Sequence, residues 1–147
     1  MHAVKKSLTC RNAGIREDGA NPTEAAEHFA NLRGQLGRCG LYFGGVAFEG
    51  YQCPVKKPAN VANLAIPYVD VVTTSIDSGM STTANMDKLA DMKRVLGGHP
   101  LAAMGKVTVE NIRAFKPYVD CLIVDTEVSP TELDRDEVRK LVRAVAQ

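Results

Sequence analysis

The chain has 147 residues, of which 18 are Lys or Arg and 17 are Asp or Glu, so its formal net charge is +1. This length suits one domain with a sizeable core, and the charge lacks the basic excess typical of nucleic-acid-binding proteins. No stretch approaches the roughly 20 apolar residues of a membrane-spanning helix. Four cysteines and three histidines are scattered along the chain, which argues against a metal site. We expect a single domain over residues 1–147 in the reducing cytoplasm, with no cofactor, metal, membrane or nucleic acid bound.

Residues 1–20 predict a short strand around Val4 to Thr9 and then a loop that carries Arg11 and Asn12. The guanidinium of Arg11 is suited to hold an anionic ligand, unless this segment is frayed. A first helix is predicted to begin at residues 21–24, Asn-Pro-Thr-Glu. These residues combine a capping side chain, a proline at the first helical position and a carboxylate where the helix dipole favours it.

Two interleaved repeats organise the rest of the chain. Pro-Tyr-Val-Asp occurs at residues 67–70 and again at 117–120, and each copy precedes an apolar, β-branched run. A second pair of matching segments, residues 30–37 and 90–97, ends in glycine before another apolar run. Helices and buried strands therefore alternate, as they do in right-handed βαβ units with a parallel sheet.

The predicted fold is an α/β fold of about four or five βα units. A complete eight-stranded TIM barrel needs about 200 residues or more. Two architectures remain, a half TIM barrel completed by a second copy of the chain, or an open, flavodoxin-like doubly wound sheet. We favour the half-barrel, which leaves two open strand edges and an apolar inner face. A homodimer closes both by symmetry.

Polar residues follow the predicted strands at the carboxyl edge of the sheet, where ligands of such folds gather. Thr74, Ser75, Asp77 and Gly79 form a loop after a buried strand, and its hydroxyl and amide groups suit a phosphate or a carboxylate. A plain connection rich in turn-forming residues is the alternative. Gly45 belongs to a glycine pair inside a strand, which is typical of a close approach by another backbone or a ligand.

Three residues are candidates for catalysis. Lys106 and Asp125 end neighbouring strands, and we interpret them as a pair in which the lysine is a phosphate ligand or an amine nucleophile. The alternative is a surface ion pair. Glu49 opens a long loop after the strand at residues 41–46, where it is placed to act as a general base, unless that loop is only a solvated connection.

Several segments resemble the later strands of a phosphate-binding TIM barrel, of the BtpA-like and related phosphoribosyl-ligand families. The likeness covers about residues 40 to 128, and it rests on the segments 44–48, 68–75, 108–111 and 124–126. It implies the C-terminal half of such a barrel, with Gly105 and Thr126 in ligand-binding turns. The chain departs from the family pattern at Lys106 and Asp125. These replace glycines that let backbone N–H groups approach a phosphate.

The sequence therefore predicts an enzyme or enzyme-derived domain that binds a small anionic metabolite, a phosphorylated one in particular, at the carboxyl ends of the strands. The alternative hypothesis is a non-catalytic half-barrel that associates with itself and serves as a binding module. Asp70 and Asp120 lie at the opposite, amino ends of their strands, and we interpret both as structural.

Overall fold

The computed structural model describes residues 8–37, 40–50, 55–124 and 135–146. Within these ranges, strands alternate with helices along the chain. The strands are β1 (Leu8–Cys10), β2 (Tyr42–Gly45), β3 (Val71–Ser75), β4 (Leu101–Gly105) and β5 (Cys121–Val124). The helices are α1 (Glu24–Gln35), α2 (Pro58–Ala65), α3 (Thr82–Leu96), α4 (Ile112–Phe115) with the 3₁₀ turn η1 (Lys116–Tyr118), and α5 (Arg135–Ala146).

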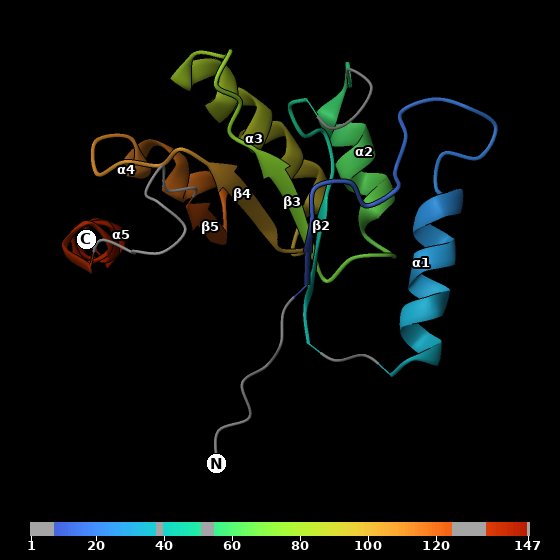
Figure 1. Cartoon of the computed structure of the whole chain (residues 1–147). Helices are drawn as coiled ribbons and strands as arrows, with labels where there is room; N and C mark the ends of the chain where they lie inside the picture. Colours follow the sequence, from blue (N-terminus) through green and yellow to red (C-terminus); the bar gives the residue numbers. More distant parts are fainter. Residues whose placement is uncertain (1–7, 38–39, 51–54, 125–134, 147) are drawn as a thin grey trace.

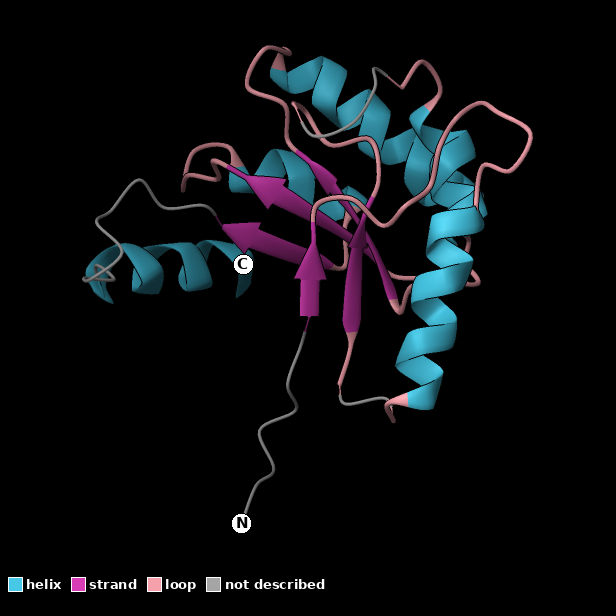
Figure 2. Ribbon diagram, turned by 45° about the vertical axis from the view of Figure 1, so that its right-hand side comes forward, coloured by secondary structure: helices cyan, strands magenta, loops and turns pink. Residues whose placement is uncertain are grey.

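All five strands are parallel and lie side by side in chain order, β1-β2-β3-β4-β5. The sheet curls into the shape of a half-barrel, with its helices on the outer side (Figures 1 and 2). The predicted α/β half-barrel is thereby confirmed. The consecutive strand order is that of a barrel segment, whereas a doubly wound sheet reverses its order at a switch point.

The two faces of the sheet differ in what covers them. On the convex face, Val72 and Leu101 join a core that includes Leu89 and Met92 of α3 and Phe115 of α4. The alternating residues point to the concave face, and none of them belongs to the buried core clusters. The larger ones are Phe43, Val71, Met104, Cys121 and Ile123.

Both sequence repeats have a structural purpose. The carboxylate of Asp70 accepts hydrogen bonds from the N–H of the first residue of β2, at 2.8 Å, and from Arg33 of α1, at 2.9 Å. The carboxylate of Asp120 does the same with the N–H of the first residue of β4, at 2.8 Å, and with Lys93 of α3. Arg33 and Lys93 occupy matching places in the second repeat. The two aspartates therefore anchor helices to the amino edge of the sheet, as expected for structural residues.

Two element boundaries differ from the sequence prediction. The first helix begins at Glu24 with Thr23 at its N-cap, two residues later than the Asn-Pro pair indicated. Of the strand predicted around residues 4–9, the structure describes the part from Leu8 onward, which extends to Cys10, and residues 1–7 lie outside the described ranges. None of the helices in the described ranges has the length and apolar character needed to cross a bilayer.

Candidate functional site

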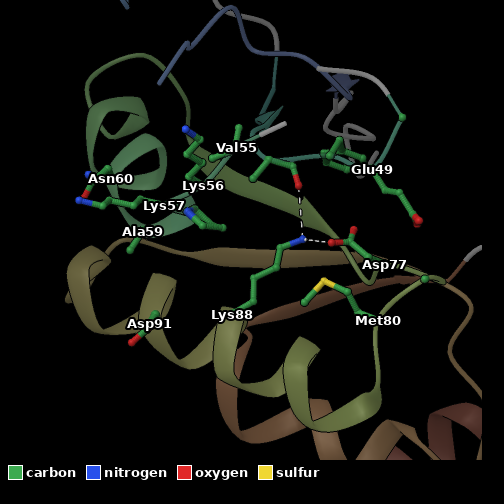
Figure 3. A pocket seen from close by; sticks show the side chains of 15 residues that line it. Glu49, Val55, Lys56, Lys57, Ala59, Asn60, Asp77, Met80, Lys88 and Asp91 are labelled. Carbon is green, nitrogen blue, oxygen red and sulfur yellow. Dashed lines mark hydrogen bonds and ion pairs between the residues drawn. The ribbon is translucent and has the colours of Figure 1, made fainter. Parts of the chain in front are cut away.

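A pocket of about 820 Å³ opens at the carboxyl edge of β2 and β3 (Figure 3). Its walls are the loop after β2 (residues 47–50), residues 55–60 at the start of α2, the loop after β3, and α3. Parallel α/β sheets bind their ligands beyond the carboxyl ends of the strands. The pocket therefore lies where this architecture places a functional site.

At the floor of this pocket, a buried lysine connects α3 to the chain segments that follow β2 and β3. The side chain of Lys88, on α3, is 6% exposed and forms an ion pair of 2.8 Å with the carboxylate of Asp77. Its ammonium also donates to the carbonyls of Ser75, at 2.9 Å, and Ala47, at 3.3 Å. These contacts use all three N–H donors of a lysine. Lys88 therefore fixes the ends of β2 and β3 relative to α3.

The backbone is in a strained conformation at Ala47, one of the residues whose carbonyl accepts a hydrogen bond from Lys88. Ala47 has a φ of 52°, the left-handed region that non-glycine residues rarely adopt. Its carbonyl accepts hydrogen bonds from Lys88 and from the buried hydroxyl of Thr74, at 3.4 Å. Such strain persists where surrounding contacts enforce it, and it concentrates at functional sites. The turn at residue 47 directs the chain along the pocket wall.

A polar network links the two loops above this floor. The hydroxyl of Ser75 donates to the carboxylate of Asp77 and accepts from the N–H of Glu49, at 2.9 Å. The Glu49 carboxylate then accepts from the N–H of Ser78, at 2.8 Å. A Cβ atom at Gly79 would lie 3.3 Å from that carboxylate, so the glycine leaves room for it. The structure thus brings together Glu49, Ser75, Asp77 and Gly79, four of the residues predicted from the sequence.

Asn85 shapes the loop after β3 from below. This side chain is 3% exposed, and its Oδ1 accepts from the N–H of Asp77 at 2.8 Å. Its Nδ2 donates to the carbonyls of Asp77, at 3.0 Å, and Ser81, at 3.2 Å. The loop that borders the pocket is therefore fixed from α3 through both Asn85 and Lys88.

Three other predicted residues gather elsewhere, at the end of β1. A Cβ atom at Gly45 would lie 2.6 Å from the carbonyl oxygens of both Cys10 and Arg11, so this glycine makes room for a neighbouring backbone. Asn12 folds back locally, and its Oδ1 accepts from the N–H of Gly14 at 2.9 Å. Arg11, Asn12 and Gly45 do not line the pocket.

The residues predicted at the ends of β4 and β5 also lie apart from the pocket. Lys106 is exposed in the turn after β4 and is not among the lining residues. A Cβ atom at Gly105 would lie 2.9 Å from Cβ of Ile76, so this glycine allows close packing beneath the neighbouring loop. Asp125 and Thr126 lie outside the described residues, and their pairing with Lys106 stays a prediction.

Two cations at the mouth of the pocket were not among the residues predicted from the sequence, because they fall in the long loop after the strand at residues 41–46. Lys56 and Lys57 precede α2, and both line the pocket. Their backbone N–H groups donate to the carboxylate of Glu17, at 2.7 and 2.6 Å. Within the described ranges, neither ammonium has an ion-pair partner. The available signal was two adjacent lysines in front of Pro58, a typical first residue of a helix.

Lys88 and Asn85 had a clearer signal that was also missed. Both fall on the helical stripe of α3 that includes the buried Leu89 and Met92, so they are polar residues at core positions. Polar side chains are buried where they make specific hydrogen bonds. In the described part of the chain, no group of three or more His, Cys, Asp or Glu residues is arranged to hold a metal ion. Neither a protein-family model nor a curated protein sequence matches the chain.

Proposed function

We propose that the protein binds a small anionic metabolite, a phosphorylated one in particular, in the pocket at the carboxyl edge of β2 and β3. Three lysines and three carboxylates, among them Glu49 and Asp91, line the pocket, and the way in which these charges are paired carries this proposal. Lys88 is neutralised by Asp77, whereas Lys56 and Lys57 line the mouth without a carboxylate partner in the described residues. Cations left without a partner at a concave site attract anions, because the walls limit their screening by water.

The two sides of the pocket suit different parts of such a ligand. The ammonium groups of Lys56 and Lys57 would bind the anionic group as point charges. Glu49 lies on the other side of Lys88 from them in Figure 3, on the loop after β2. If the bound metabolite reacts, Glu49 is the carboxylate placed to accept a proton from it.

The resemblance to BtpA-like phosphoribosyl-ligand barrels supports the same class of ligand. It concerns the strands whose carboxyl ends form the pocket, in particular residues 44–48 and 68–75. The proposal differs from that resemblance in one respect. It places the anionic group beside Lys56 and Lys57, and not at the turn that carries Lys106.

Isothermal titration calorimetry with ribose 5-phosphate and with ribose tests the proposal. We expect the phosphate ester to bind and the free sugar not to bind. Lys56→Ala with Lys57→Ala should weaken binding at least about tenfold, because a hydrogen bond to a charged group contributes about 1.5–3 kcal/mol. Lys106→Ala and the remote control Lys140→Ala should leave the affinity unchanged.

Two results would overturn this assignment. Failure of wild-type protein to bind inorganic phosphate or any of a panel of phosphate esters would reject the anionic ligand. Loss of binding in Lys106→Ala, with normal binding in the Lys56→Ala, Lys57→Ala variant, would move the site to the turn after β4.

Self-association of the half-barrel is a second candidate function, compatible with the first. Phe43, Met104 and Ile123 point to the concave face, are partly exposed and lie outside the core clusters. Partly exposed apolar side chains gathered on one face are typical of interaction surfaces. We propose a homodimer in the reducing cytoplasm, a setting that the free thiols of Cys10 and Cys121 suit. Light scattering should give twice the chain mass of 15.9 kDa.

A further inference from the structure

On the basis of this self-association, we infer that a second copy docks edge to edge. β5 of one copy would pair in parallel with β1 of the other, and α5 of the first copy would pack on α1 of the second. A two-fold axis along the barrel axis makes this junction twice and joins both open edges of the curled sheet. Figures 1 and 2 show α1 and α5 at opposite ends of the sheet, as such closure requires.

Exposed apolar side chains gather at these two ends of the sheet. Leu36, the C-cap of α1, is 83% exposed, and Val142 on α5 is 63% exposed. Of the large exposed hydrophobic residues in the described ranges, only Met80, in the loop after β3, and Val109, in the turn before α4, lie outside the two edge regions of the sheet. The others at the first end are Leu8, Leu32 and Leu41, and the other at the second end is Val145.

Comparison of the two copies of the internal repeat shows that α1 lacks a neighbouring element on one side. Leu32 of α1 and the C-cap residue Leu36 match Met92 and Leu96 of α3 in the repeated segments. On α3 these positions are 0% and 4% exposed, because α3 lies between neighbouring helices over the middle of the sheet. On α1 they are 40% and 83% exposed, because β1 is the edge strand and no described element lies beyond it. The leucines thus occupy positions that a further βα unit covers elsewhere in the fold.

Helix α5 has a complementary surface. Leu141 and Ala144 are buried in a cluster with residues of α4 and the turn before it. Val138, Val142 and Val145 continue the same apolar arc around the helix, and the last two are exposed. About half of this arc is therefore covered within one chain, and the other half faces away from α4.

Strand edges and charge support the same arrangement. Among the described strands, β1 pairs with β2 alone and β5 with β4 alone, so each forms an edge of the described sheet. Four basic and two acidic side chains lie on α5, whereas α1 has two acidic side chains and one arginine. Helices of opposite net charge favour contact with each other over contact with their own kind.

The test uses aspartate substitutions at each end and the mass in solution by light scattering. We expect dimers for the wild-type chain and for the control Met80→Asp, an exposed apolar position in the loop after β3, away from α1 and α5. Leu32→Asp with Leu36→Asp should give monomers, and so should Val142→Asp with Val145→Asp. Circular dichroism verifies that each variant remains folded, which the exposure of these positions favours.

Mixing the two double variants provides a sharper criterion. One junction of the mixed dimer joins an unchanged α5 to an unchanged α1, so we expect the mixture to recover species of twice the chain mass. Double variants that remain fully dimeric would overturn the edge-to-edge arrangement but leave self-association intact. A monomeric wild-type chain at high concentration would overturn self-association itself.

Discussion

Replacing Lys88 with methionine is expected to lower the free energy of unfolding by about 3 kcal/mol. Methionine keeps most of the length of the side chain, so packing is nearly preserved. What is lost is the ion pair with Asp77 and two hydrogen bonds to backbone carbonyls. Breaking a buried pair by removing one partner costs about 3–5 kcal/mol. The lower end applies, because the Asp77 side chain is 15% exposed and can regain some contact with water.

Urea denaturation followed by circular dichroism measures this cost. Lys93→Met is the matched control, because Lys93 lies on the same helix but pairs with Asp120 at the surface, where an ion pair contributes at most about 1 kcal/mol. Adding Asp77→Asn to Lys88→Met should recover part of the loss, because the uncompensated carboxylate is then removed. A loss below about 1 kcal/mol for Lys88→Met, or strictly additive effects in the double variant, would refute the structural role of the Lys88–Asp77 ion pair.

Three further changes test other features of the structure. Thr73→Val should leave the free energy of unfolding unchanged or raise it by up to about 1 kcal/mol, because the buried Thr73 hydroxyl has no partner in the described residues. Thr74→Val should lower the free energy of unfolding, because the Thr74 hydroxyl donates to the carbonyl of Ala47. The opposite order of the two variants would contradict this reasoning. Burial lowers the pKa of His99 below its ordinary 6.5, and the nearby Asp70 carboxylate opposes this only in part. The unfolded chain therefore takes up this proton first, so stability should be full above pH 6.5 and decline as the pH falls toward the lower pKa of the folded state. In urea titrations at several pH values, His99→Gln should make the free energy of unfolding less dependent on pH below 6.5. An unchanged pH dependence would argue against this role of His99. Gly45→Ala should cost about 1–3 kcal/mol and loosen β1, since its Cβ atom would meet backbone, and wild-type stability would contradict the close approach.

The architecture was predictable because it depends on local patterns. Buried β-branched runs, the repeated Pro-Tyr-Val-Asp and the glycines at helix ends each indicate a βα unit without any knowledge of tertiary contacts. The aspartates of that repeat were also interpreted correctly, since their place at the amino end of a strand follows from chain order alone. The start of the first helix was predicted less accurately, because the proline that suggests it lies in the preceding turn.

The candidate site was only partly predictable. Ser75 and Asp77 lie at a strand end, so sheet topology alone brings them to the loop after β2, where Glu49 lies. Lys88 binds main-chain carbonyls of two different strands, and the directions of such carbonyls cannot be inferred from side-chain types. Gly45 was recognised as a close-approach position, but only the structure shows that a backbone takes that space. Whether the half-barrel dimerises stays a prediction.

The central claim is that the pocket built around Lys88 is the ligand site. A titration of ¹⁵N-labelled protein with ribose 5-phosphate, followed by amide chemical shifts, tests it most directly. Saturable shifts should concentrate at residues 47–50, 55–60 and 77–80, which border the pocket. Shifts confined to the turn at residues 105–108, or no saturable shifts with any phosphate ester, would contradict the account.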